Sequence, residues 1–511
     1  MMRRVGMLLL AIALMATAPG TAGAAPPFRT EVLQFAAKPG GASTLHTGDR
    51  LVAGLRALGL SPRGFEVLPM VVVSGTPNQL AAARALPQVL YAHPDERLKL
   101  ALDKTVPLVY RGPPAPIRAA NGGGRGVRVA IVDTGIDGLH PDLGSRVVEN
   151  VRFVDTDATG GAEGQPSGLG LPAARVPISC PLACDTDDTG HGTMVAGVVA
   201  GPGTKDGLLA GMTPEAELVG LSWDSGVPKT IYALAAYDYI LAHPELHIMV
   251  VNNSWGLDWG RRFEPTHPIN QATKMLHDAG ITVVFAAGNQ GQGTPAPGQP
   301  YGSSNCLNGG ATDCAISMIG SAPWAIMVAG GAEVTQGSTP EQQDLWTADP
   351  SNSSSRGDPR PDRVDGIDVR YTPTLTAPAS VIITTAATSE PLKCVGVFCP
   401  GHSDQPFYTE ASGTSLAAPH VAGAIALLQT AAKARLGRFL SPDEVKQLLV
   451  QGAARMTHPF AEPCGQVTGC PAGGPPAGAY APWQVGAGYL DVPGTLHALD
   501  RYAAGDQPGM Q

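Results

Sequence analysis

Short apolar runs alternate with longer segments whose apolar positions recur at helical spacing, from about residue 127 onward. Strands are expected at 127–132, 217–223, 248–252, 281–286 and 324–329. Helices are expected at 231–242, 271–279 and 415–434, and after the Ser-Pro-Asp-Glu sequence at 441–444. Strands that are almost wholly apolar and alternate with helices predict an α/β fold, with a mostly parallel sheet covered by helices on both faces.

The segment before this sheet has a pattern of its own. The β-branched sequence FEVLPMVVVS at 65–74 predicts a strand, Thr76 and Pro77 begin a helix, and 89–92 predicts a second strand. We therefore expect a separate small α+β unit. After it, proline and glycine become frequent, which indicates an exposed linker.

The first residues resemble a secretory signal. Arg3 and Arg4 precede an apolar run at 5–18, which is shorter than the roughly 20 residues of a membrane span. Ala22-Gly23-Ala24 fits the small-x-small cleavage pattern, so we expect cleavage after Ala24 and a secreted protein, extracellular or periplasmic. No later segment predicts a membrane span.

The chain thus divides into a signal peptide, an α+β unit, a linker, an α/β domain and a frayed tail. Their expected bounds are 1–24, 25–102, 103–125, 126–498 and 499–511.

The amino-acid composition excludes two classes of protein, globally disordered chains and nucleic-acid binders. Hydrophobic residues make up 43% of the 511, enough for a large core, so global disorder is excluded. The chain has 64 glycines and 47 prolines, which indicates many tight connections around that core. A formal net charge of −9 leaves no basic surplus, so we expect no nucleic-acid partner.

Eight cysteines agree with an oxidising compartment. They fall into close pairs along the sequence: Cys180 with Cys184, Cys306 with Cys314, Cys394 with Cys399, and Cys464 with Cys470. Proximity favours local disulfides that staple loops onto the core, although the sequence alone does not choose among the many possible connectivities. A zinc site is the alternative, and it would require reduced thiolates and further ligands.

Three short motifs carry the candidate chemistry. Asp133 ends the first apolar strand, His191 lies in the small-residue turn DTGHGTMVAG, and Ser415 begins the long helix in SGTSLAAPH. A serine hydroxyl needs an adjacent base, a histidine can be that base, and a buried carboxylate can orient the histidine. The chain order Asp, His, Ser excludes the α/β-hydrolase and chymotrypsin orders.

Together these motifs resemble those of the subtilisin-like (subtilase) serine peptidases. The resemblance implies a secreted endopeptidase that forms an acyl-enzyme on Ser415. His191 would be its general base and acid, and Asp133 would orient His191. It also implies that residues 28–100 are an inhibitory propeptide, so that the enzyme is made as a zymogen.

The same resemblance assigns the substrate-binding segments. Ala286-Ala287-Gly288-Asn289 matches the segment whose asparagine donates to the oxyanion, so Asn289 is the expected oxyanion-hole residue. Ser254-Trp255-Gly256 matches the strand that lines the P1 pocket and pairs with the substrate. The bulk of Trp255 is expected to restrict access. Two cysteine-bearing insertions, 153–184 and 290–314, leave the substrate preference open.

The remaining polar residues near these motifs receive structural interpretations. We expect Asp137, His140 and Asp142 to support loops, and His420 to pack inside the long helix. No cofactor is required for the chemistry. Structural calcium is compatible with the family, but no spacing defines a cage. The carboxylates that could bind it are Asp155, Asp157, Asp185 and Asp187.

The expected partners are protein or peptide substrates and the chain's own propeptide, and we expect a monomer. Two other functions fit the same motifs. A catalytically silent relative could act as a binding protein on this fold. The same acyl-enzyme could also serve a peptide ligase or cyclase.

Overall fold

The computed structural model describes most of the chain, in segments. These are residues 29–35, 43–94, 99–100, 106–154, 175–180, 184–203, 209–223, 229–256, 263–289, 316–332, 339–345, 347–349, 352–357, 363–364, 367–368, 373–380, 382–388, 407–457, 480 and 482–506. The expected signal peptide and six of the eight cysteines lie outside these residues.

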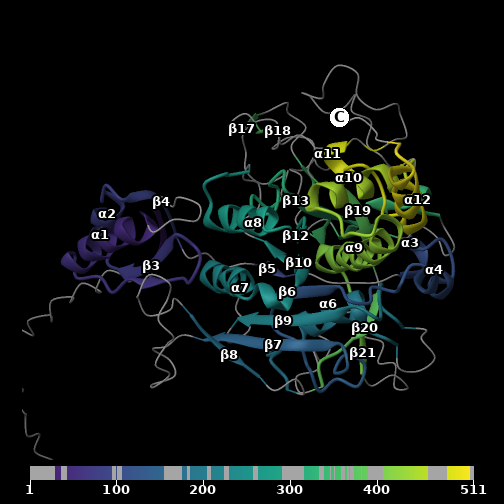
Figure 1. Cartoon of the computed structure of the whole chain (residues 1–511), viewed down its shortest axis with the longest axis horizontal. Helices are drawn as coiled ribbons and strands as arrows, with labels where there is room; N and C mark the ends of the chain where they lie inside the picture. The colour runs from purple at the N-terminus through teal and green to yellow at the C-terminus, as the bar shows by residue number, and fades with distance from the viewer. Residues whose placement is uncertain are drawn as a thin grey trace, which may run out of the picture.

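A central sheet organises the large domain (Figure 1). In the described part of the chain its path runs through β14 (Asp344–Leu345), β13 (Ala325–Ala332), β12 (Thr282–Ala286), β10 (Ile248–Asn253), β6 (Arg128–Asp133), β9 (Glu217–Trp223), β7 (Val147–Val154) and β8 (Val176–Ser179), with β19 (Leu375–Pro378) also paired to β13. Neighbours from β13 to β7 are parallel, whereas β14 and β8 pair antiparallel at the edges. The predicted mostly parallel sheet is confirmed.

Helices cover both faces of this sheet, as predicted. On one face lie α6 (His191–Ala200), α9 (Thr414–Leu436), α10 (Pro442–Gly452) and α12 (Val492–Ala503). On the other face lie α7 (Thr230–Ala242) and α8 (Pro268–Asp278). Strand β6 serves both faces because successive side chains point in opposite directions: Val129 and Ile131 join the first cluster, Ala130 and Val132 the second.

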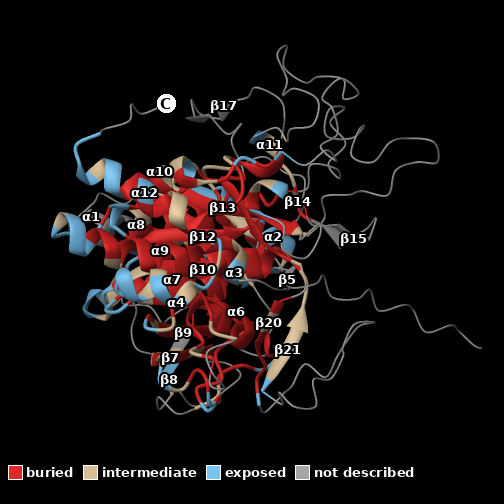
Figure 2. Ribbon diagram, turned by 90° about the vertical axis from the view of Figure 1, so that its right-hand side faces the viewer, coloured by how far each residue is buried: buried red, intermediate tan, exposed pale blue. Residues whose placement is uncertain are grey.

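Helix α9 crosses the core of the large domain (Figure 2). Among the described residues it is the one helix long and apolar enough to span a membrane, but 94% of its apolar window is buried inside the protein. Such burial is typical of a core helix. The next helix, α10, begins as the sequence predicts, because Ser441 Oγ accepts a hydrogen bond from the N–H of Glu444.

A smaller unit (residues 29–94, the N-terminal unit) precedes the large domain (Figure 1). Its described strands are β1 (Arg29–Phe35), β2 (Arg63–Gly64), β3 (Met70–Gly75) and β4 (Val89–Pro94), paired antiparallel in the order β2-β3-β1-β4. Helices α1 (Ser43–Ala57) and α2 (Pro77–Arg84) accompany this sheet, and the unit has a hydrophobic cluster of its own. It is therefore a compact α+β unit.

Part of the segment expected to be an exposed linker, 103–125, is instead packed into the large domain. Residues 106–126 contain α3 (Val106–Val109) and α4 (Pro114–Ala120). Val109 and Tyr110 are buried in the core of the large domain, and Tyr110 Oη donates to the carbonyl of Met212 at 2.7 Å. This segment belongs to the large domain, because tertiary burial overrides its proline- and glycine-rich composition.

Residues 499–503 of the expected frayed tail are helical. Helix α12 continues to Ala503, and Leu499 is fully buried. The remaining described elements are short: β5 (Lys99–Leu100), η2 (Pro244–Leu246), β11 (Trp255–Gly256), η3 (Pro340–Gln342), β15 (Thr347–Asp349), β16 (Asn352–Ser353), β17 (Arg363–Val364), β18 (Ile367–Asp368), β20 (Ile382–Thr385), β21 (Tyr408–Ala411) and α11 (Pro482–Val485).

Candidate active site

Asp133 and His191 meet where β6 ends and α6 begins. His191 Nδ1 lies 2.5 Å from Asp133 Oδ1, and the N–H of Thr134 donates to the same oxygen at 2.8 Å. Both side chains are buried, with exposed fractions of 3% for His191 and 0% for Asp133. Because a carboxylate oxygen accepts here, the proton resides on Nδ1, and Nε2 is the nitrogen able to take up another.

Two glycines permit this close approach. A side chain on Gly192 would collide with the carbonyl of Gly135, which lies in the turn after β6. Gly135 itself has φ +126°, in the region that side chains rarely adopt. The glycines of the two motifs therefore bring the histidine turn against the aspartate turn.

Ser415 lies in the first turn of α9 and is linked to Ser254 in both directions. Ser415 Oγ donates to the Ser254 carbonyl at 2.6 Å, and Ser254 Oγ donates to the Ser415 carbonyl at 2.5 Å. The second bond depends on Pro419. Its missing N–H leaves the carbonyl of residue 415 without the usual helical donor four residues on. The strand end and the helix start are thereby locked together.

Asn289 lies beside this helix start. Its Oδ1 accepts hydrogen bonds from the N–H of Thr414 at 2.9 Å and from Thr414 Oγ1 at 2.8 Å. The amide of a side chain is planar, so these two bonds fix where Nδ2 points, on the side away from Thr414. The hydroxyl of Thr414 also accepts from the N–H of Gly288 at 3.0 Å. Thr414 thus positions both Asn289 and the backbone before it.

The comparisons with known proteins agree with this geometry. The family model described as the subtilase family matches residues 124–466. The chain belongs to the subtilase family. It is thus a subtilisin-like serine endopeptidase by family, as its motifs predict.

Relatives of this subtilase include the "Intracellular serine protease" of Paenibacillus polymyxa, 27% identical over 334 residues, 64% of this chain and 74% of that protein. The "Alkaline elastase YaB" of a Bacillus strain is 30% identical over 251 residues, 49% of this chain and 56% of that protein. Fervidolysin from Fervidobacterium pennivorans shares the fold, with a TM-score of 0.59 at 20% identity. That alignment covers 92% of this chain and 61% of fervidolysin.

The segment expected to bind substrate carries a strand of the chain itself. Trp255 and Gly256 of β11 pair antiparallel with Leu100 and Lys99 of β5. Strand β5 lies between the N-terminal unit and α3. The segment that follows the N-terminal unit therefore occupies the position on β11 that was predicted for substrate.

The expectation that Trp255 restricts access to the subtilase cleft is wrong. Its Nε1 donates to the Val132 carbonyl at 2.6 Å, and its ring meets those of Phe285 and Trp223 edge-on, with centroids 5.4 and 5.7 Å away. The side chain is buried in the core, and only the backbone is placed for strand pairing.

Ala287 and Gly288 have their main-chain groups engaged inside the protein. Ala287 N–H donates to the Val328 carbonyl at 2.9 Å, and the Gly288 carbonyl accepts from the N–H of Ser355 at 2.8 Å. Gly288 has φ +104°. These described main-chain groups are therefore bonded within the protein rather than presented to a substrate.

The structural interpretation of the other motif residues agrees with their contacts. Asp137 accepts from the N–H of Leu139 and from both donors of Thr388. His140 Nε2 lies 2.8 Å from the Phe407 carbonyl, and burial lowers the pKa of His140. His420 is buried, with Nδ1 2.7 Å from the Leu416 carbonyl.

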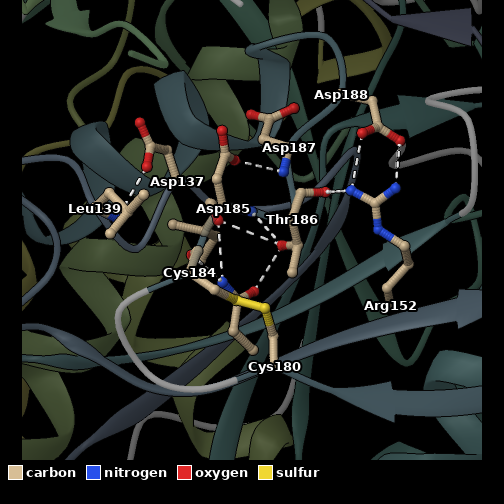
Figure 3. Close-up of a disulfide and its surroundings, with 11 residues drawn as sticks. Asp137, Leu139, Arg152, Cys180, Cys184, Asp185, Thr186, Asp187 and Asp188 are labelled. Carbon is tan, nitrogen blue, oxygen red and sulfur yellow. Dashed lines mark hydrogen bonds and ion pairs between the residues drawn. A yellow bond between two sulfur atoms is a disulfide. The ribbon is translucent and has the colours of Figure 1, made fainter. Parts of the chain in front are cut away.

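A disulfide joins Cys180 to Cys184 just before the histidine turn, as their spacing predicts (Figure 3). Figure 3 also shows Arg152 holding Asp188 of this turn through two bonds of 2.8 Å. The turn is therefore fixed from its outer side.

The other three expected disulfides stay predictions, because all six of their cysteines lie outside the described residues. These are the pairings of Cys306 with Cys314, of Cys394 with Cys399, and of Cys464 with Cys470.

The possible calcium ligands separate into two groups. Asp155 and Asp157 lie outside the described residues. Both carboxylate oxygens of Asp187 accept hydrogen bonds from N–H or O–H groups, so they are not available to bind a cation. Asp185 Oδ1 accepts a hydrogen bond from the N–H of Asp187. Within the described segments, no group of three His, Cys, Asp or Glu could hold a metal ion.

Proposed function

We propose that this subtilase hydrolyses peptide bonds of protein substrates through an acyl-enzyme on Ser415. The observation that carries the proposal is the bond from His191 to Asp133. It fixes the tautomer in which Nε2 can accept the serine proton. Ser415 Oγ would attack the substrate carbonyl while His191 takes its proton. His191 would then return that proton to the leaving amine, and water would release the acyl group.

Charge that develops on the substrate carbonyl oxygen needs donors that are already in place. Ser415 begins α9, where the N–H groups of the first turn and the helix dipole favour negative charge. Asn289, oriented through Thr414, would add its Nδ2.

Labelling with a fluorophosphonate tests this proposal. The probe should modify the purified secreted protein, and mass spectrometry should place the adduct on Ser415. A processed protein that takes no adduct there would favour the silent binding protein. If the adduct forms, added amines distinguish the remaining alternative, since a ligase or cyclase would transfer the acyl group to the amine rather than to water.

Asn289→Leu is expected to lower kcat by about 10²–10³ with little change in KM. The leucine side chain has similar bulk but cannot donate to the oxyanion. The variant also loses the two bonds that Oδ1 accepts from Thr414, whereas the bond to the oxyanion forms only as charge develops, so its loss falls on kcat. Steady-state kinetics on a peptide substrate measure both constants. A variant that keeps the wild-type kcat would remove Asn289 from the oxyanion hole.

Secretion and zymogen formation are part of the proposal. Residues 1–24 have the organisation of a signal peptide, although a relative is named an intracellular protease. Support for a propeptide comes from the pairing of β5 with β11 and from the docking of the N-terminal unit onto α7. In that docking, the Asp238 carboxylate accepts the N–H groups of Glu66, Val67 and Leu68 at 2.6 to 2.9 Å.

The docking of the N-terminal unit is expected to weaken as pH rises through about 6. Burial raises the pKa of Asp238 to about 6, the three N–H donors oppose that rise, and the nearby charge of Glu66 adds to it. Once released, Asp238 would return toward its ordinary pKa of 3.8. The docked form therefore binds the proton more tightly. This proton binding stabilises docking by at most about 3 kcal/mol. The stabilisation is fully present below about pH 4 and is lost above about pH 6.

Hydrogen exchange on the Ser415→Ala full-length protein measures this dependence. Protection factors of the amides of residues 66–68 should fall between pH 4 and pH 7, about the window set by that linkage. In Asp238→Asn they should not vary with pH. His93 is a titratable residue of the same unit that contacts the large domain elsewhere, 3.7 Å from Glu264, so His93→Gln is the control and should keep the dependence. An unchanged slope in Asp238→Asn would refute the assignment.

A further inference from the structure

A second buried carboxylate lies in the turn that carries His191. Asp187 is only 2% exposed. It has no role in the catalytic motifs or in the mechanism proposed above. Oδ1 accepts from Thr134 Oγ1 at 2.7 Å, from the N–H of Thr189 at 3.1 Å and from the N–H of Gly190 at 2.8 Å. Oδ2 accepts from the N–H and Oγ1 of Thr193 at 2.8 and 2.6 Å. Figure 3 shows Asp187 in this turn, close to Asp185 and Thr186.

The hydroxyl protons in this network have defined directions. Thr134 Oγ1 accepts the N–H of Gly192, and Thr193 Oγ1 accepts the N–H of Asp137, so each hydroxyl is left to donate to Asp187. Every contact given above thus presents a hydrogen to Asp187. Five donors on the two oxygens of Asp187 suit its ionised form, because a protonated acid would need an acceptor for its own hydrogen.

These donors connect the two halves of the site. Thr134 follows Asp133, and its N–H donates to the oxygen that holds His191. Gly190 is the N-cap residue of α6 and has no side chain to cap it. Asp187 instead accepts the N–H of Thr193, which an N-cap side chain would normally bind. Asp187 therefore links the end of β6 to the first turn of α6.

We propose that Asp187 is a positioning residue of the catalytic site, an ionised carboxylate that fixes the His191 turn against Asp133 and favours the imidazolium formed during catalysis. The proposal rests on the proposed function of His191 as the base. Asp187 accepts the N–H of Gly190, the residue before His191, and a negative charge buried there stabilises the protonated ring more than a charge in water would. Burial opposes ionisation of Asp187 and raises its pKa, while the bonds from Thr193 and Thr134 lower it.

The other charged groups around this turn make different contacts. Asp188 pairs with Arg152 on the outer side. Asp185 Oδ1 accepts from the N–H of Asp187. Asp137 is buried as deeply as Asp187, but its donors come from Leu139 and Thr388, outside the His191 turn. Asp137 is therefore a matched control carboxylate.

The test follows His191 directly by NMR in full-length protein that carries Ser415→Ala, so it needs no activity. The low-field Nδ1 proton reports the bond to Asp133, and its pH dependence gives the titration midpoint of His191. Adding Asp187→Asn should lower the pH of the His191 titration midpoint and shift the Nδ1 proton resonance upfield. Asp137→Asn should change neither. With the serine restored, Asp187→Asn should lower kcat by up to about a hundredfold at nearly constant KM.

Unchanged NMR signals in Asp187→Asn, or equal changes in both variants, would overturn the proposal. If Asp187→Asn does not fold, Thr193→Val decides, with Thr388→Val as its control, since each removes one hydroxyl donor from a buried carboxylate. Only Thr193→Val should move the Nδ1 proton, and identical spectra would overturn the assignment. A wild-type protein without peptidase activity would refute the proposed function and leave this result standing.

Discussion

His191→Ala and Ser415→Ala should each lower kcat for peptide hydrolysis by about 10⁶, and the double variant should be no slower than that. The serine proton must leave as the new bond to carbon forms, and His191 is held in the tautomer whose Nε2 can accept a proton, because Nδ1 lies 2.5 Å from Asp133 Oδ1. Removing either partner disables the same step, so the two losses do not add. Single-turnover and steady-state kinetics on one peptide substrate measure the effect.

A second buried histidine provides the control for this experiment. His140→Gln removes a ring that contacts the Phe407 carbonyl and lies outside the proton path. It should lower the temperature of unfolding while kcat stays near the wild-type value. A double variant slower than both single variants by about a further thousandfold would show that serine and histidine do not act as a unit.

The sheet could be predicted because each parallel strand is a nearly continuous apolar run. Strand β12, for example, has the sequence TVVFA and is buried along its whole length. The first strand of the N-terminal unit, by contrast, shows no such apolar run. Strand β1 has only Val32, Leu33 and Phe35 as strongly apolar residues, and its polar Glu31 and Gln34 are buried too. Its strand character comes from pairing with β3 and β4.

The linker illustrates the opposite error. Prolines and glycines between 103 and 125 are typical of exposed loops, yet Tyr110 inserts into the core and Arg118 donates to the carbonyl of Met212. Both contacts join residues about a hundred positions apart, and local composition carries no information about them. Trp255 was misjudged for the same reason, since its partners Val132 and Phe285 belong to other strands.

Within the site, the sequence predicts residues that lie at the ends of predictable elements. Asp133 ends β6, His191 begins α6 and Ser415 follows the first residue of α9. The sequence does not show which side chains hold these residues in place. Thr414 reaches Asn289 across 125 positions, and the Ser254 hydroxyl reaches the Ser415 carbonyl across 161. Both residues stand in quoted motifs, but the motifs do not indicate these contacts, which only the folded arrangement shows.

Processing of the precursor is the other large expected effect, because it is all or none. The antiparallel register of β5 with β11 pairs Lys99 with Gly256 and Leu100 with Trp255, so the chain runs toward Ser254 as it leaves β5. Ser254 is the residue whose carbonyl accepts the Ser415 hydroxyl. Helix α3 begins at Val106 and belongs to the large domain. We therefore expect the cut between Leu100 and Val106, a narrower interval than the linker composition suggests.

N-terminal sequencing of the wild-type and Ser415→Ala proteins decides this prediction. Self-processing requires the wild type to begin between residues 101 and 106, and the Ser415→Ala protein to begin near Ala25. If both begin near Ala25, the N-terminal unit is a permanent domain, and if both begin at 101–106, another protease makes the cut. A start beyond Val109 would contradict the structure, because the cut would detach a side chain that the core of the large domain buries completely.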